Sequence, residues 1–203
     1  MSEQLQSDFD KIVKNSKFSN KEIQLKKNFL NKFIESGFPN RKQEDWKFLD
    51  ISQIIKKNIS DLSYFIDYSQ SNKIDPSTFV DGLEHNKIIF LNGRIEKIDF
   101  NHEEQNKIEI SDETKKDILF DYENSLIDLN SAFTDKVFKI LVKKDYSLKK
   151  PLIIYHSTND SIKSTNINLR LDFELGENSC LKLIDYFANN TTKNFINIFY
   201  NFD

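Results

Sequence analysis

The chain has 203 residues, 38% hydrophobic and 30% charged, which is long enough to bury a sizeable core in one large domain or two small ones. Its 29 lysines and arginines nearly balance 32 aspartates and glutamates, and the net charge of -3 argues against a general nucleic-acid-binding protein. The N-terminus has no apolar stretch of signal-peptide length, and the apolar runs are too short to span a bilayer. We therefore expect a cytoplasmic protein that binds neither nucleic acid nor membrane.

Cysteine and glycine are both scarce, which excludes several kinds of site. Cys180 is the only cysteine, so neither an intramolecular disulfide nor a thiolate-only metal site can form within one chain. The four glycines lie far apart, whereas loops that cradle phosphate need clustered glycines. This excludes nucleotide-binding loops of the P-loop and dinucleotide types, and it leaves asparagine and aspartate to form most turns.

The first third of the chain has helical periodicity. Apolar residues at helical spacing indicate a short helix around residues 9–13 and a longer one over residues 21–35. Ser19 can cap the start of the longer helix, and Gly37 ends it in the expected order. Asn40, with a glutamine three residues later, predicts the start of a third helix.

The middle of the chain contains a connector and a hairpin. Residues 60–84 hold turn formers with little periodicity, so we expect a connector with one short helix. Asn92-Gly93 then separates two β-rich arms, residues 87–91 and 94–100, which is a strong hairpin signal. The segment 109–133 is mixed and is expected to end in a helix with the sequence SLIDLNSAF.

After this segment the sequence predicts strands. In INLRLDFEL, leucine and phenylalanine alternate with Arg170, Asp172 and Glu174, which predicts a half-buried strand. KILVKKDYSLKKPLIIY also resembles DFELGENSCLKLIDY at an offset of about 33 residues, a period typical of stacked β-solenoid coils or repeated supersecondary units. The chain ends in a strand pattern, FINIFYNFD, without a polar cap, so we expect it to be the N-terminal part of a longer protein.

The residues that most often carry catalysis or bind metal form no recognisable motif. His85, His102 and His156 lie outside metal-ligand spacing of one another and of Cys180, which we interpret as a small buried apolar residue. We therefore predict no catalytic, cofactor-binding or metal-binding residues, and no enzyme activity.

Carboxylates on a strand face offer one alternative. A β-helical carbohydrate-active enzyme would use residues such as Asp172 and Glu174 on an outer strand face. Both share that face with Arg170, however, and a solvated strand face explains this pattern better. The lysine pairs at residues 143–144 and 149–150 flank turns and are expected to be solvated loop tips.

Trp46 is the only tryptophan, and it lies in the charged stretch FPNRKQEDWKFLD. Arg41, Glu44 and Lys47 lie near it at helical spacings of three, where each exposed pair contributes about 0.2–0.5 kcal/mol. Burying the indole contributes roughly 1.5–3 kcal/mol, which outweighs those pairs. We therefore expect Trp46 to cover the seam between consecutive N-terminal helices.

Four stretches, in order along the chain, resemble SufD proteins of the SufB/SufD family. They are FPNRKQEDWKF with its Trp-Lys-aromatic signature, the strand-Asn-Gly-Arg hairpin IIFLNGRIEKI, the passage LNSAFTDKVFKILVKKDYSLKKPLIIYHS, and LGENSCLKLIDYF. The third stretch is similar to the family's most typical passage, in which Leu-Asn-x-Ala leads into a strand. After Ala132-Phe133 the family commonly has Asp-Gly, where this chain has Asp135-Lys136, and the departure leaves the turn type open.

The resemblance implies an α+β, mainly β fold. An N-terminal helical domain with its connector would cover residues 1–84, and the first coils of a right-handed parallel β-helix would cover residues 85–203. It also implies a non-catalytic scaffold subunit of the SufB–SufC–SufD complex for iron–sulfur cluster assembly.

The partners that the resemblance implies are a SufB-like paralogue and a SufC-like ATPase, bound mainly through a C-terminal part that this chain lacks. The iron–sulfur cluster would be handled by the complete complex, and this segment would bind no cofactor. Two alternatives remain open: a β-helical carbohydrate-active enzyme and a stand-alone β-rich interaction module.

Overall fold

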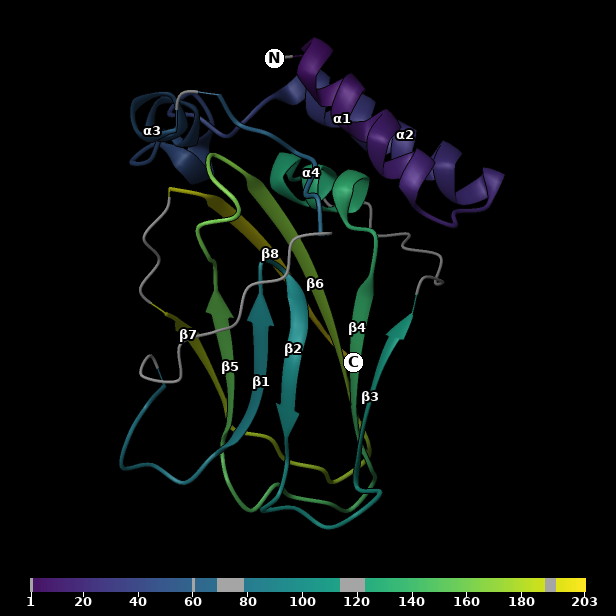
Figure 1. Ribbon diagram of the computed structural model, residues 1–203, viewed down its shortest axis with the longest axis vertical. Helices are drawn as coiled ribbons and strands as arrows, with labels where there is room; N and C mark the ends of the chain where they lie inside the picture. Colours follow the sequence, from purple (N-terminus) through teal and green to yellow (C-terminus); the bar gives the residue numbers. More distant parts are fainter. Residues whose placement is uncertain (1, 60, 69–78, 114–122, 189–192) are drawn as a thin grey trace.

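The computed structural model describes residues 2–59, 61–68, 79–113, 123–188 and 193–203. Within these residues, the helices gather at one end of two four-stranded β-sheets (Figure 1). The helices are α1 (Ser2–Asn15), α2 (Asn20–Ser36), the 3-10 helix η1 (Glu44–Trp46), α3 (Ile51–Asn58) and α4 (Ser125–Phe133). The strands are β1 (Asn86–Leu91), β2 (Arg94–Asp99), β3 (Ile108–Glu113), β4 (Val137–Val142), β5 (Leu152–Ser157), β6 (Asn166–Leu175), β7 (Leu183–Phe187) and β8 (Phe195–Phe202).

Both sheets are mixed and have the same plan. The first has the strand order β2-β1-β5-β7 and the second β3-β4-β6-β8. In each sheet three strands are parallel, and the fourth is an antiparallel edge strand: β2 pairs with β1, and β3 pairs with β4. Val137 of β4 pairs with Arg170 of β6, so these two strands have the 33-residue offset that the sequence repeat shows.

The prediction of a right-handed parallel β-helix is wrong. The described strands form two mixed sheets of four strands each, and neither sheet closes or continues as a solenoid. The repeat in the sequence predicts that strands one period apart pair in parallel, and β4 and β6 do so. Parallel pairing is common to open sheets and solenoids, however, so the repeat does not determine how the sheets are connected.

The boundaries of α2 and the β1–β2 hairpin confirm the sequence predictions. The side chain of Ser19 accepts a hydrogen bond from the Glu22 N–H at 3.3 Å, and the Glu22 carboxylate accepts one from the Ser19 N–H at 2.7 Å, which forms a capping box. Gly37 ends the helix with a positive φ of 69°. Asn92 and Gly93 have φ angles of 51° and 81°, as a tight hairpin turn requires.

The predicted third helix does not begin at Asn40. The Asn40 side chain instead accepts a hydrogen bond from the Lys42 N–H at 3.0 Å, a local turn that competes with helix capping. The chain then forms only the short η1, and α3 begins later, where the Asp50 side chain accepts from the Gln53 N–H at 2.9 Å. The expected short helix of the connector falls largely on residues 69–78, outside the described residues.

Two large apolar clusters form the interior. The first lies among the helices and combines α1, α2 and α4; its fully buried members include Leu5, Leu30, Phe33 and Leu129. The second lies between the two sheets, where the rings of Phe90 and Phe138 are 5.1 Å apart. Because α4 packs with the N-terminal helices, the first cluster joins residues from both sides of the expected domain boundary after residue 84, which stays a prediction.

Candidate functional site

A short segment, residues 61–68, runs beneath α1 toward the sheets, and we call it the strap (Figure 1). Ser63 forms a parallel bridge with Thr165 just before β6. Its N–H donates to the Ser164 carbonyl at 2.8 Å, and its carbonyl accepts from the Asn166 N–H at 2.7 Å. The strap is therefore hydrogen-bonded to the end of the second sheet that faces the helices.

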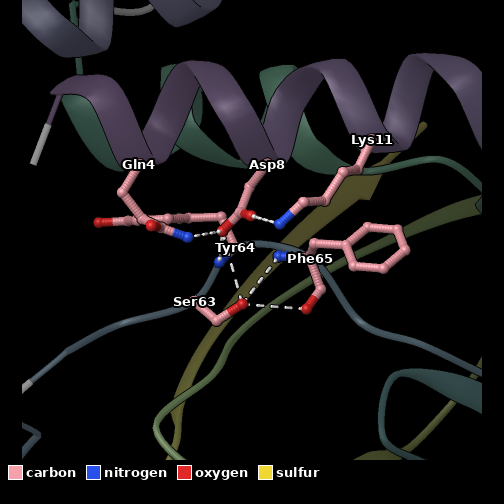
Figure 2. Close-up of polar contacts among 6 residues, drawn as sticks. All are labelled: Gln4, Asp8, Lys11, Ser63, Tyr64 and Phe65. Carbon is pink, nitrogen blue, oxygen red and sulfur yellow. Dashed lines mark hydrogen bonds and ion pairs between the residues drawn. The ribbon is translucent and has the colours of Figure 1, made fainter.

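Asp8 of α1 fixes the other side of the strap. Its side chain is fully buried and accepts hydrogen bonds from the Tyr64 N–H at 2.9 Å, from Gln4 at 2.8 Å and from the Lys11 ammonium at 2.8 Å (Figure 2). Burial alone would raise the pKa of the Asp8 carboxyl, but the bonds from Lys11, Tyr64 and Gln4 outweigh it and lower this pKa below 3.8. The carboxylate thus holds the strap against α1 in its charged form.

A cavity of about 510 Å³ lies where the strap, α1, the hairpin turn and the start of β6 meet. Its apolar walls include Ile12, Phe65 and Phe133. Its polar walls include Arg94 from the first position of β2 and Asp135 from the link between α4 and β4. It joins segments from five separate parts of the sequence: α1, the strap, the start of β2, the end of α4 with its link to β4, and the start of β6.

Arg94 and Asp135 form an ion pair inside this cavity, and both side chains are half-buried. The Arg94 guanidinium also lies 4.1 Å from the centre of the Tyr68 ring, in a cation–π contact. Burial lowers the pKa of Arg94, but the bond to Asp135 and the charges nearby raise it overall, while burial raises the pKa of Tyr68 to about 12. The two residues of the ion pair come from two different stretches that resemble the SufB/SufD family, the Asn-Gly-Arg hairpin and the Leu-Asn-x-Ala passage.

Asn130, also in the Leu-Asn-x-Ala passage, attaches α4 to the second sheet. Its amide Nδ2 donates to the carbonyls of Leu169 in β6 and Asn197 in β8, at 3.0 and 2.9 Å. Its Oδ1 accepts from the Thr134 hydroxyl at 3.0 Å, and Asn197 donates back to the Leu126 carbonyl at 2.8 Å. The Asn130 Nδ2 therefore holds α4 across two strands, while its Oδ1 bonds to the C-terminal end of the same helix.

Lys26 connects α2 to the same helix. Its ammonium donates to the carbonyls of Ser131, at 3.0 Å, and Thr134, at the C-terminal end of α4, where the helix dipole favours a cation. The Phe18 ring lies 4.9 Å below the ammonium. Burial lowers the pKa of Lys26 to about 8, although the charge of Asp135 opposes this. Sequence reasoning missed this contact, because helical periodicity places Lys26 among the polar residues of α2.

We call the contacts of Asp8, Lys26, Asn130 and the Arg94–Asp135 pair the joint, and His85 and His102 do not form part of it. His85 is buried beside the first sheet, with Nδ1 at 2.6 Å from the Leu83 carbonyl and Nε2 at 2.8 Å from the Tyr155 hydroxyl. Tyr155 in turn accepts from the Val80 N–H at 3.2 Å, so His85 supports the segment that precedes β1. His102 is exposed in the turn after β2.

His156 lies between the sheets, near their β7 and β8 edges. Its ring is stacked between Phe90 of β1 and Phe187 of β7, at centroid distances of 5.8 and 4.9 Å. Its Nε2 lies 2.6 Å from the Asp185 carboxylate and 3.2 Å from the Tyr200 hydroxyl, which connects the two sheets. Burial, together with the bond to Asp185, raises the pKa of Tyr200. The His156 ring thus makes a polar contact between the two sheets.

The strand-face carboxylates are bound by cations. Arg170 donates to the Asp172 carboxylate at 2.9 Å, and Glu174 forms an ion pair with Lys139 of the neighbouring strand β4. The expectation of a solvated strand face is wrong at Arg170, which is only 4% exposed; its guanidinium lies 5.3 Å from the centre of the Phe199 ring. This arrangement does not favour Asp172 and Glu174 as an acid/base pair.

The four lysines at the turns also form ion pairs, and each is paired with a glutamate. The pairs are Lys143–Glu109, Lys144–Glu177, Lys149–Glu104 and Lys150–Glu84. The interpretation of Cys180 as a buried residue is wrong, because it is exposed in the bridge that pairs it with Ser147.

Neither a metal centre nor a membrane span is found among the described residues. No group of three or more histidine, cysteine, aspartate or glutamate side chains is placed to hold an ion there. No helix in that part of the chain is long and apolar enough to cross a bilayer. The prediction that this segment binds no cofactor stays a prediction.

No protein-family model matches the chain, and no curated protein matches it either. The resemblance to SufD therefore depends on the four stretches themselves. What the structure adds is the position of their residues: Arg94 pairs with Asp135, and Asn130 bonds α4 to β6 and β8.

Proposed function

We propose that this chain is part of a non-catalytic scaffold subunit of an iron–sulfur cluster assembly complex of the SufB–SufC–SufD type, acting in the cytoplasm. The observation that carries the proposal is the ion pair between Arg94 and Asp135, because it joins two of the stretches that resemble the family. Asn130, from the same passage as Asp135, holds α4 to β6 and β8. Arg94, Asp135 and Asn130, which lie in stretches similar to those of the family, thus connect helices and strands to one another.

Such a joint suits a subunit that must keep its shape while partners act on it. The bonds of Asp8, Arg94 and Asn130 attach the strap, the hairpin and α4 to their neighbours through directed contacts. Directed polar contacts fix the relative position of packed elements more strictly than apolar packing does. A force from an ATPase partner would then move the helices and the second sheet together. The cluster itself would be cargo of the complete complex, in which a SufB-like paralogue and a SufC-like ATPase are the partners.

Co-purification tests this proposal. The complete gene product, carrying an affinity tag, is expressed with the SufB-like and SufC-like proteins of the same organism, and the eluate is separated by size-exclusion chromatography. We expect the three proteins to co-elute. Elution of the folded gene product without either partner would refute the proposed function. Cells that lack their own SufD provide a second readout, the activity of an iron–sulfur enzyme restored by the gene product.

Arg94 offers a variant with a matched control. Arg94→Ala removes the ion pair at the joint, while Lys97→Ala removes an exposed cation from the same strand. We expect the Arg94 variant to restore less enzyme activity than the Lys97 variant at equal protein levels. Equal restoration would show that the joint is not needed for the scaffold role.

A further inference from the structure

The charged stretch around Trp46 forms a loop that closes on itself. The Ile51 N–H donates to the Pro39 carbonyl at 3.1 Å, so the two ends of residues 39–51 lie side by side. Between them, the Trp46 N–H donates to the Gln43 carbonyl at 3.0 Å and the Leu49 N–H to the Trp46 carbonyl at 2.8 Å. Compact surface loops of this length with closed ends frequently have a functional role.

This loop presents apolar side chains to solvent. Phe48 is 86% exposed, Leu49 is 42% exposed, and Ile54 in the first turns of α3 is 43% exposed. Trp46 is half-buried and belongs neither to the two large apolar clusters nor to a small third one around Tyr155. It therefore does not cover the seam between helices that the sequence led us to expect. We call Trp46, Phe48, Leu49 and Ile54 the loop patch. Grouped exposed apolar side chains are typical of interaction surfaces, whereas single ones are ordinary.

The charges around the loop patch are mostly positive. Four exposed cations lie close to the loop in the sequence, Arg41, Lys42, Lys56 and Lys57, and none of them forms an ion pair with another described residue. Among the acidic residues of the same stretch, Glu44 is paired with Lys47 and the Asp50 side chain caps α3, which leaves Asp45. Residues 39–58 thus carry five cations and three carboxylates, a local positive excess in a chain whose net charge is -3.

We propose that the loop patch is a docking surface for a partner protein, and that the partner supplies an acidic segment with apolar side chains. The apolar residues would cover Phe48 and Leu49, and the carboxylates would face the unpaired cations. Oppositely charged rims of this kind steer association and select the partner. The inference does not require the proposed scaffold function, because it depends only on the loop and its charges.

Two other occupants fit the observations less well. A second copy of this chain, bound through the same surface about a two-fold axis, would bring the unpaired lysines of both copies together. An anionic membrane surface would attract the lysines but would repel the exposed Asp45, which adjoins Trp46. A protein surface can meet charges of both signs, and this favours a protein partner.

Site-specific photo-cross-linking tests the proposal. A photoreactive benzoylphenylalanine replaces Phe48 in the full chain, which is expressed in its own host, and cross-linked peptides are sequenced by mass spectrometry. Ile98 is the matched control position, because it is 45% exposed on β2, away from the loop patch. We expect position 48, and not position 98, to cross-link to an acidic, apolar segment of another protein.

Charge reversal completes the test. Lys56→Glu combined with Lys57→Glu should reduce the cross-link yield at position 48 by about tenfold, which is the lower end of the range for electrostatic steering. A product with lipid, with a second copy of the chain or with a basic segment would overturn the proposal, as would a yield no greater than that at position 98. If the acidic segment belongs to a protein other than a SufB-like or SufC-like one, the docking surface stands, and the proposed function is decided separately by the co-purification experiment.

Discussion

Replacing Asp8 with alanine is expected to detach the strap from α1 and to lower the free energy of unfolding by about 3 kcal/mol. The carboxylate accepts hydrogen bonds from Lys11, Gln4 and the Tyr64 N–H (Figure 2). Lys11 is 50% exposed and can turn to water, but the Tyr64 N–H is left in a buried place without its acceptor. A buried donor without a partner costs about 1–3 kcal/mol, and the loss of bonds to a charged group adds roughly 1–2 kcal/mol.

Urea and thermal unfolding followed by circular dichroism measure this change. For a chain of this size, 3 kcal/mol corresponds to a decrease in Tm of about 6–12 °C. Asp10→Ala is the control, because Asp10 lies on the same helix and its bond to Gln6 is exposed; we expect a change below about 0.5 kcal/mol. Asp8→Asn keeps an acceptor for Tyr64 and should fall between the two. Equal stability of the Asp8→Ala and Asp10→Ala variants would refute the reasoning.

The hydrogen bonds to Asp8 also determine how the free energy of unfolding changes at acidic pH. The folded-state pKa of Asp8 is lower than the ordinary value of 3.8, so the unfolded chain binds the proton more readily. The stabilisation from Asp8 is therefore fully present above that ordinary value, and it is lost as the pH falls through the lowered folded-state pKa. Free energies of unfolding measured between pH 6 and about pH 2 should show a smaller loss in Asp8→Asn than in the wild type.

Three further predictions follow from the joint and the sheets. Because burial lowers the pKa of Lys26 to about 8 from 10.5, the unfolded chain holds more protons between these values, and the free energy of unfolding should rise with pH across this window in the wild type but not in Lys26→Met. Asn130→Ala should lower the free energy of unfolding by about 2–4 kcal/mol, measured by urea titration, because two buried carbonyls lose their donor. Gly176→Ala should destabilise by more than about 2 kcal/mol, because its Cβ would come 2.4 Å from the Lys144 backbone nitrogen, whereas Gly82→Ala meets no atom within 4 Å and should cost only its backbone strain, about 1 kcal/mol.

Features set by neighbouring residues could be predicted from the sequence. The capping box at Ser19, the end of α2 at Gly37 and the Asn92-Gly93 hairpin each depend on a few adjacent residues, and the structure has all three. The 33-residue repeat indicated repeated units, and the strands one period apart, β4 and β6, do pair in parallel. These features can be recognised from a short stretch of sequence, without knowing how the rest of the chain folds.

Features that depend on distant partners could not be predicted. Nothing near Asp8 or Lys26 in the sequence indicates that Tyr64 or the end of α4 will supply their hydrogen-bond partners. The alternation in β6 separates two faces correctly but cannot reveal that Arg170 is covered by Phe199. The β-helix prediction was wrong for the same reason, because strand pairing at a fixed period leaves the connection between sheets undetermined.

The polar contacts at the joint fix the position of α4 along the second sheet, which the apolar clusters alone cannot do. Leucine and phenylalanine side chains in the helical cluster would tolerate small sliding movements, because apolar packing is not directional. Asn130 cannot shift by one residue along β6 or β8 without losing both carbonyl acceptors, and Lys26 reaches only the last carbonyls of α4. The apolar clusters therefore supply most of the free energy of folding, while these few polar side chains specify the register of α4 on the second sheet.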